Sequence, residues 1–358
     1  MIKILEGFRV VCDPNKKLAH SGEVLLGLGN TQSASEGLVL QHKMSGKKYS
    51  SLSQYVYELE VDSDLTEYDT LCIEDFSVDT ILSIWLFLNK KSQNLLPKNI
   101  DIWIKYASRW ERGDTSTTGK PFESYGCLQN ALVLFAKSVD AVTKLDKSLS
   151  FLDYLIKCNI NPAHIPNNFK LALYDDAYKS LEQEYAYYET IVTQSKAKIL
   201  YVPKSNSDKV KKVSAIFIET EIVSSIHKVF LRNDINSLTR DGYALMAVYN
   251  ASAKGTGNDI VISVDPGKGI HMKALWQALE KEEDELWKGM RPNDSPRPLS
   301  GYPDNNGPNE PWWDDMGHYT LIAAPKMIDN EYGRRVSWET VKQLINKLYT
   351  KGIKHDRT

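Results

Sequence analysis

The segment from Leu71 to Leu88, a short apolar run joined to a longer one by an acidic loop, constrains the fold most. The run Asp69–Ile73 is short and rich in residues that favour β-structure, which predicts a buried strand. The loop EDFSVD follows, and then TILSIWLFLNK, which is apolar on nearly every helical face and predicts a buried helix. This order is the first half of an α/β unit, with the loop at the carboxyl end of the strand, where open α/β sheets form their sites.

The rest of the chain also alternates predicted strands and helices, so we expect an α/β protein. Its 358 residues are enough for two domains of ordinary size. The polar, basic stretch 204–212 predicts a linker between two domains. The N-terminal domain, residues 1–203, is expected to hold a mostly parallel sheet with flanking helices. The C-terminal domain, residues 213–358, is expected to be a smaller α/β domain.

The remaining elements are predicted from periodicity and capping residues. Further strands are expected at Gly7–Cys12, Gly37–Gln41, Val213–Glu221, Ile226–Arg232, Ala244–Tyr249, Asp259–Val264 and Tyr319–Ala323. Further helices are expected at Lys98–Arg109, Leu128–Leu145, Leu149–Asn159 with Ser148 as N-cap, Asn168 to about Lys196, Lys273–Lys288 and Trp338–Tyr349.

Charge and hydropathy argue against several functional classes. The net charge is −2, so no general positive field attracts long duplex nucleic acid or an anionic membrane. No run of about 18 apolar residues occurs, so no transmembrane helix is predicted, and the N-terminus reads as a strand and not as a signal peptide. The four cysteines are widely spaced and form no CxxC pair, which favours a reducing compartment. We therefore expect a cytoplasmic protein.

The acidic loop is the first candidate site, with Glu74, Asp75 and Asp79. Carboxylates held together at a strand end repel one another and commonly bind Mg²⁺ or Mn²⁺. Asp114, which follows Arg112-Gly at the end of a predicted helix, is a candidate for one more ligand. Structural roles are the alternative, since Asp79 suits the N-terminus of the helix that follows it and Asp114 suits a turn. The predicted catalytic metal ligands are Asp75, Asp79 and Asp114.

A second candidate group follows the Pro-rich stretch 289–311, which predicts a long irregular loop. The adjacent Trp312 and Trp313 can stack a base or a sugar. Their alternative role is to anchor the loop on the core. His318 and Lys326 come next and are suited to contact phosphate. The predicted substrate-binding residues are Arg112, Trp312, Trp313, His318 and Lys326.

The stretch from Cys72 to Trp85 resembles the loop that opens the DHH phosphoesterase superfamily. That loop reads H-x-x-P-D-x-D-A, and in a poorly characterised bacterial branch it reads approximately H-F-D-x-D-G followed by S-x-W. In this chain Asp79 matches the last acid, with Ser83-Ile-Trp85 behind it. Asp75 stands at the His position and Ser77 at the first Asp position, and no Asp-His-His triplet occurs in the chain.

The C-terminal part is similar to the same family in the order of its motifs. Trp312-Trp-Asp-Asp and then Ala323-Ala-Pro-Lys resemble in layout the W-G-G and G-S-P-R stretches that close the family's site. The resemblance implies a two-domain phosphoesterase in which two Mn²⁺ ions generate the attacking hydroxide. The replaced ligands imply a much weaker metal affinity.

Three functions follow from these observations. The first is a metal-dependent phosphoesterase, with Mn²⁺ or Mg²⁺, that acts on a nucleotide or short oligonucleotide. The second is a degenerate DHH-like module that binds a nucleotide or a protein partner without hydrolysis, for example in bacterial defence. The third is an assembly protein or homodimer whose contact face is the Tyr-rich helix near Tyr185–Tyr188.

Overall fold

The chain forms two compact units in the computed structural model, Met1–Glu184 and Tyr185–Thr358, here called the N-terminal unit and the C-terminal unit. The structure describes residues 8–28, 37–40, 43–44, 47–48, 51–59, 67–115, 123–135, 140–166, 175–220, 225–253, 258–288, 311–314, 318–325 and 333–350. The boundary between the units falls inside helix α6 (Asp175–Gln194), whereas the sequence suggested residue 203.

The sheet of the N-terminal unit has the order β1-β6-β2-β3, formed by β1 (Arg9–Cys12), β6 (Thr70–Ile73), β2 (Glu23–Leu26) and β3 (Leu38–Leu40). Every neighbouring pair is parallel, which confirms the expected mostly parallel sheet. Strand β6 is internal and all four of its residues are buried. This burial explains its apolar sequence, because a strand inside a parallel sheet is covered on both faces.

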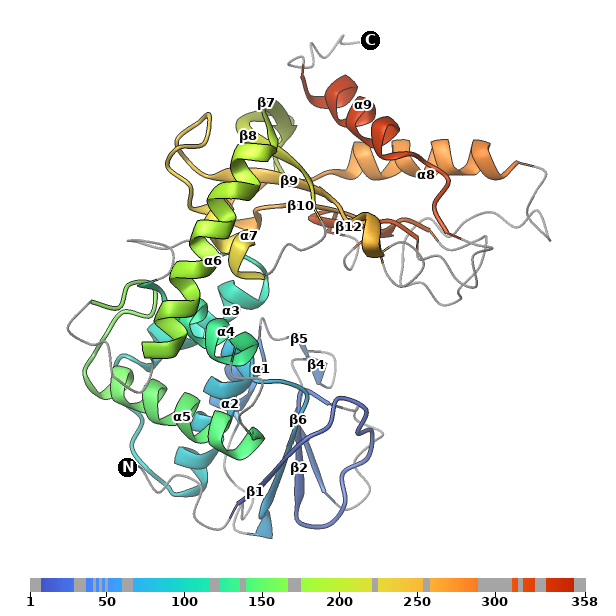
Figure 1. Ribbon diagram of the computed structural model, residues 1–358. Coiled ribbons are helices and arrows are strands. Elements are labelled where there is room, and N and C mark those ends of the chain that lie inside the picture. The colour runs from blue at the N-terminus through green and yellow to red at the C-terminus, as the bar shows by residue number, and fades with distance from the viewer. Residues whose placement is uncertain are drawn as a thin grey trace. The chain divides into compact units, whose positions relative to one another are not determined.

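Helix α2 (Val78–Lys91) is the central helix of the N-terminal unit and is buried from Val78 to Leu88. Four helices pack against it or its neighbours: α1 (Leu52–Glu58), α3 (Ile100–Glu111), α4 (Tyr125–Phe135) and α5 (Ala141–Lys157) (Figure 1). A short hairpin, β4 (Lys43–Met44) with β5 (Lys47–Lys48), precedes them. Helix α2 is apolar on nearly every face because other helices and the sheet surround it.

The helix boundary expected at Ser148 is wrong. Helix α5 begins after Asp140, whose side chain accepts a hydrogen bond from the Thr143 backbone N at 2.9 Å. The helix then continues through Ser148, which is buried and accepts a hydrogen bond from Gln129 Nε2 at 3.0 Å. The sequence alone does not distinguish a serine inside a helix from a serine at a helix N-cap. Here the Ser148 hydroxyl lies inside the helix and has Gln129 of α4 as its hydrogen-bond partner.

The C-terminal unit contains a mixed sheet with the order β11-β12-β10-β9-β8-β7. Its strands are β7 (Lys196–Pro203), β8 (Val210–Glu219), β9 (Tyr243–Tyr249), β10 (Ile260–Val264), β11 (Trp313–Asp314) and β12 (Leu321–Ala323). Only the β8–β9 pair is parallel among these neighbours. Single-turn 3₁₀ helices, η6 (Ala251–Ala253) and η7 (Pro266–Lys268), lie on either side of β10 in the chain.

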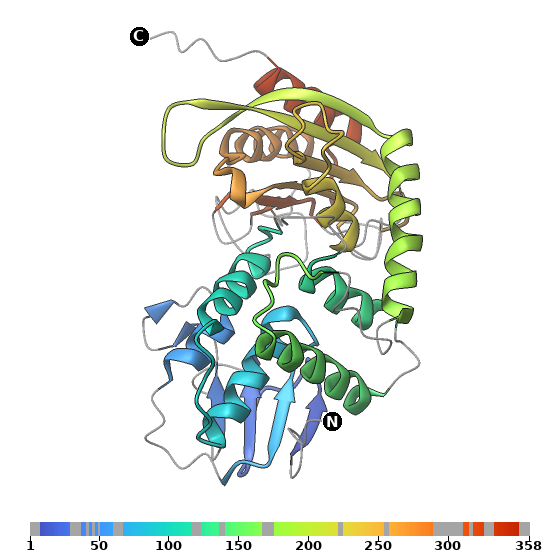
Figure 2. The same ribbon diagram turned by 90° about the vertical axis from the view of Figure 1, so that its left-hand side faces the viewer.

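Two helices complete the main core of the C-terminal unit. Helices α8 (Lys273–Trp287) and α9 (Trp338–Tyr349) pack on each other and bury Trp276, Leu279 and Val341 in the same cluster as the sheet. Figure 2 shows helix α6 running into edge strand β7. The described part of the chain has no helix that is both long and apolar enough to cross a membrane.

The expected linker at 204–212 lies within the β7–β8 hairpin. Strand β8 already begins at Val210, and the Lys204 backbone N donates to the Lys209 carbonyl at 2.9 Å. A linker and an exposed hairpin turn both favour Lys, Ser, Asn and Asp, so composition alone did not distinguish them.

The expected strand Ile226–Arg232 is a helix, α7 (Ser225–Arg232). Ile226, Val229 and Phe230 are buried, and their spacing of three and four residues is helical. Tyr185 and Tyr188 of α6 pack on Phe230 at ring-centroid distances of 5.2 and 5.5 Å. Tertiary packing on α6 therefore outweighs the β-branched composition of this segment.

Candidate functional site

The loop after β6 places Asp75 on the surface, where it shapes the start of α2. The Asp75 carboxylate accepts hydrogen bonds from the Ser77 backbone N at 2.9 Å and from Thr80 Oγ1 at 3.0 Å. Ser77 is the N-cap of α2 and accepts from the Thr80 backbone N at 3.2 Å. Asp75 thus has a local structural role, and its exposed carboxylate belongs to a turn that starts a helix.

Asp79 is buried, with 6% of its surface exposed, and caps a helix other than its own. Its carboxylate accepts hydrogen bonds from the backbone N atoms of Leu52 at 2.6 Å and Ser53 at 3.1 Å, and a further one from Ser53 Oγ. Leu52 and Ser53 are the first residues of α1, where helix N–H groups lack partners within the helix. The negative charge therefore lies at the positive end of α1.

Serine hydroxyls extend this network from α1 to α3. Ser51 Oγ lies 3.1 Å from Ser53 Oγ and 2.7 Å from Ser108 Oγ, and all three side chains are buried. Asp79 of α2 is thereby connected through α1 to α3. This arrangement fixes the orientation of three helices. It also occupies lone pairs of the Asp79 carboxylate that a metal ion would need.

Asp114 folds back onto the helix that precedes it. Gly113 has φ 77°, a left-handed conformation that ends α3 after Arg112. The Asp114 backbone N then donates to the Arg109 carbonyl at 2.9 Å. Its carboxylate accepts two hydrogen bonds from the Arg109 guanidinium, at 2.8 and 3.1 Å. The turn alternative thus accounts for Asp114.

The three predicted ligands do not form a metal site. Within the described ranges, no group of three or more His, Cys, Asp or Glu side chains is placed to hold a metal ion. Asp79 is engaged by α1, Asp114 by Arg109, and Asp75 by the turn before α2. The donor set therefore does not fit the two-metal centre that the family resemblance implied.

Glu111, at the end of α3, is the residue near the acidic loop that sequence reasoning missed. Protein atoms around the Glu111 carboxyl group reduce its hydration, which disfavours the charged form and is the main cause that raises its pKa to about 8. The negative charges of Asp79 and then Asp75 raise the pKa further. Part of the Glu111 side chain is nevertheless exposed to water. Glu74 adds a smaller effect in the same direction. The signal in the sequence is its position in the run Trp110-Glu-Arg-Gly-Asp114, three residues before the predicted ligand Asp114.

Replacing Glu111 with Gln should remove a pH-dependent loss of stability. The folded protein holds this proton up to about pH 8, whereas the unfolded chain releases it near the ordinary value of 4.5. Stability should therefore fall as pH rises between these values, because the folded state binds more protons. Exposure to water makes the effect smaller than for a fully buried carboxyl. The thermal midpoint of each protein is measured at pH 5 and at pH 8.5. The midpoint of Glu111→Gln minus that of the wild type should be larger at pH 8.5 than at pH 5.

The matched control for this prediction is Glu282→Gln, which removes an exposed carboxylate from α8. Its difference from the wild type should be the same at both pH values. Parallel pH profiles for the wild type and Glu111→Gln would contradict the raised pKa.

Arg112 lies at the end of α3 and lines a groove between α1 and α3. Its Nε donates to the Ser108 carbonyl at 3.1 Å. A guanidinium has four further N–H donors for a ligand. The groove has a volume of about 460 Å³ and also has Lys105 and Arg109 in its lining. The predicted phosphate contact thus lies in a ligand-sized groove lined by both cations and acids, in which Arg109 is already paired with Asp114.

Trp312 is a core residue, so the expectation that it stacks a ligand is wrong. Its surface is 0% exposed, its Nε1 donates to Glu283 Oε2 at 3.1 Å, and its carbonyl accepts from Trp276 Nε1 at 2.7 Å. The alternative stated for this pair, an anchor on the core, is the role that Trp312 has. Burial of both the ring and its polar atoms explains why a large aromatic residue follows a Pro-rich stretch.

The other predicted binding residues of this group belong to the C-terminal unit. Trp313 is half-buried in β11, and its neighbour in β12 is Ala323. His318 is exposed. Lys326 lies outside the described residues. Comparison with known proteins adds no assignment to these positions: no protein-family model, no curated protein and no solved structure matches this chain.

Proposed function

We propose that this chain is a DHH-like module that binds a nucleotide or short oligonucleotide in the groove between α1 and α3, without a two-metal hydrolytic centre. The observation that carries the proposal is that Arg112 and Lys105 line this groove, while Arg109 in the same lining is paired with Asp114. The family likeness is supported by Asp79, the retained acid at the start of α2, and by a parallel-sheet unit followed in the chain by a mixed-sheet unit.

The groove has the chemical groups that a nucleotide requires. Its volume, about 460 Å³, is within the range of about 300–1,000 Å³ that small-molecule sites occupy. Lys105 and Arg112 supply positive charge for phosphate, and Tyr57 supplies an aromatic ring for a base. Glu58 and Asp101 lie in the same lining and can accept hydrogen bonds from ribose hydroxyls.

The acidic loop supports binding without two-metal hydrolysis. A hydrolytic Mn²⁺ pair needs several oxygen or imidazole ligands that are free to coordinate. Asp79, the acid that matches the family motif, has both carboxylate oxygens hydrogen-bonded to α1. Its retention in this chain is explained by the position of α1.

Phosphoester hydrolysis is the second candidate function, favoured by one observation. The raised pKa of Glu111, about 8, keeps this carboxyl largely protonated at neutral pH. A protonated carboxyl group next to other acids can act as a general acid towards a leaving oxygen. This candidate places the chemistry on Glu111, with Asp75 near it, and leaves Asp79 in its structural role.

Removing the Arg112 side chain should weaken nucleotide binding. The probes are AMP and the dinucleotide pApA, titrated into the full chain by calorimetry. A charge-assisted contact to phosphate is worth about 1.5–3 kcal/mol, so Arg112→Ala should weaken binding by about tenfold or more. Lys17→Ala removes an exposed cation of the N-terminal unit outside the groove and should change binding by less than about twofold.

Two outcomes of the same titrations would count against the proposal. Equal weakening by Lys17→Ala and Arg112→Ala would indicate attraction to surface charge in general. Turnover of pApA that requires added Mn²⁺ and is lost in Glu111→Gln would replace binding with hydrolysis as the function.

A further inference from the structure

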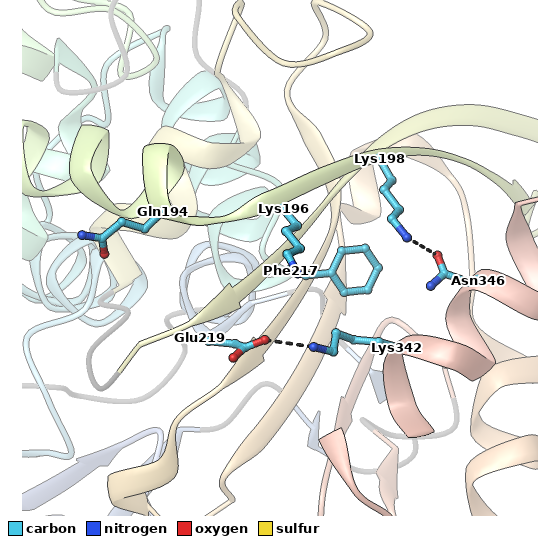
Figure 3. Close-up of a pocket in the computed structure, with 7 residues that line it drawn as sticks. All are labelled: Gln194, Lys196, Lys198, Phe217, Glu219, Lys342 and Asn346. Atoms are coloured by element: carbon cyan, nitrogen blue, oxygen red, sulfur yellow. Dashed lines mark hydrogen bonds and ion pairs between the residues drawn. The ribbon is translucent and has the colours of Figure 1, made fainter. Parts of the chain in front are cut away.

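A small pocket in the C-terminal unit lies between the edge of the sheet and helix α9. Its volume is about 190 Å³, and three lysines and one glutamate are in its lining: Lys196, Lys198, Lys342 and Glu219. The ring of Phe217 lies among them. Figure 3 shows Lys196 of β7 ending beside this ring, Lys198 of β7 directed to Asn346, and Lys342 of α9 directed to Glu219.

The geometry of the sheet brings these side chains to one face. Lys196 and Lys198 are two residues apart in β7, so their side chains point to the same side. Lys196 is paired in register with Phe217 of β8, and Glu219 is two residues further along that strand. Lys342 and Asn346, one helical turn apart on α9, complete the pocket. The positive charges therefore converge because of strand register and helix periodicity.

The charge of Glu219 is already neutralised within the pocket. Trp338 Nε1 donates to Glu219 Oε1 at 2.7 Å, and Lys342 Nζ donates to the same oxygen at 3.0 Å. These two hydrogen bonds lower the pKa of Glu219. Lys342 also pairs with Glu339 at 2.5 Å. Glu219 is thus hydrogen-bonded to α9, and its interaction with Lys196 of β7 is a smaller contribution to its lowered pKa.

The lysines of β7 have no comparable anionic partner. Lys198 Nζ donates to the neutral Asn346 Oδ1 at 3.1 Å and lies 5.9 Å from the centre of the Phe217 ring. Lys196 has no ion pair with a described residue, although its charge contributes to lowering the pKa of Glu219. Two like charges on one face repel each other, and an anion between them would remove that repulsion.

We propose that this pocket binds a phosphomonoester, with Lys196 and Lys198 contacting the phosphate and Phe217 contacting an aromatic or apolar substituent. A phosphomonoester carries up to two negative charges at neutral pH and presents three oxygens in different directions, which matches two cations on one face of β7. A carboxylate has one charge in one plane and matches this arrangement less well. The site is separate from the groove between α1 and α3.

The test is calorimetric titration of the full chain with phenyl phosphate, with benzoate as the planar, singly charged comparison. The wild type should bind phenyl phosphate saturably and benzoate more weakly. Replacing both Lys196 and Lys198 with Gln should weaken phenyl phosphate binding by at least about tenfold, which corresponds to about 1.4 kcal/mol. The single variant Lys196→Gln removes an exposed side chain and should show part of the same loss without disturbing the Lys198–Asn346 contact.

The matched control is Lys212→Gln, an exposed lysine of β8 outside the pocket. It should leave the affinity within about twofold of the wild type. Arg112→Ala should also leave it unchanged, so failure of the nucleotide groove and failure of this pocket can be told apart. Absence of saturable binding by the wild type, or equal weakening by Lys212→Gln and Lys196→Gln, would overturn the proposal.

Discussion

Asp79→Ala should lower the free energy of unfolding by about 3 kcal/mol, because it leaves buried donors of α1 without acceptors. The Leu52 and Ser53 backbone N atoms both donate to this carboxylate, and Asp79 is only 6% exposed. Loss of a helix cap alone costs about 1 kcal/mol, and each unsatisfied buried donor adds about 1–3 kcal/mol. Urea denaturation followed by circular dichroism measures the change as a shift of the midpoint.

Asp75→Ala and Asp79→Asn are the controls for this prediction. Asp75 is exposed, so its removal should cost less than about 1 kcal/mol. Asn at position 79 keeps one oxygen acceptor but presents an N–H group in place of the other, so its stability should fall between Asp79→Ala and the wild type. A midpoint for Asp79→Ala equal to that of Asp75→Ala would mean that Asp79 has no role in holding α1. Such a result would reopen its assignment as a catalytic or metal-binding residue.

The sequence was sufficient for the elements around Asp79 but not for its role. The strand before the acidic loop and the helix after it were predicted because both are defined by local apolar pattern. The partners of Asp79 are at Leu52 and Ser53, on a helix earlier in the chain. Spacing along the chain contains no information about such a contact, so the sequence offered Asp79 as a metal ligand or as a cap of its own helix, and not as the cap of α1.

Two further differences have the same physical origin. Trp312 was expected at a ligand because an aromatic pair beside a Pro-rich stretch suggests a surface, yet Glu280 and Glu283 of α8 provide polar partners that allow its burial. Segment 226–232 was expected as a strand from composition, and its packing against α6 makes it a helix. For Trp312 a distant element supplied partners that local pattern could not indicate, whereas the three- and four-residue spacing of Ile226, Val229 and Phe230 was a local signal for a helix that the β-branched composition outweighed.

Glu283 shows how a single acid can organise the C-terminal unit, and Glu283→Ala should have the largest effect of the substitutions considered. The side chain of Glu283, on α8, is 0% exposed. Its Oε1 accepts from Trp287 Nε1 at 3.1 Å and from the Arg335 backbone N at 2.5 Å. Its Oε2 accepts from Trp312 Nε1 at 3.1 Å and from the Val336 backbone N at 3.3 Å. Four donors from three parts of the chain thus depend on one carboxylate.

Removing that carboxylate should cost about 4 kcal/mol, because unpaired buried donors and a cavity both oppose folding. The fluorescence of Trp287 and Trp312 should also shift to longer wavelength at a lower urea concentration than in the wild type. The reason is that the indole N–H groups of both residues lose the Glu283 carboxylate that accepts their hydrogen bonds. Glu282→Ala, at the exposed neighbouring position on α8, should cost less than about 0.5 kcal/mol. Glu283→Gln should retain more than half of the destabilisation of Glu283→Ala, because its amide group turns one acceptor into a donor that faces other donors. Equal midpoints for Glu282→Ala and Glu283→Ala would contradict the assignment of Glu283 as the acceptor that joins α8 to the segments of Trp312 and Val336.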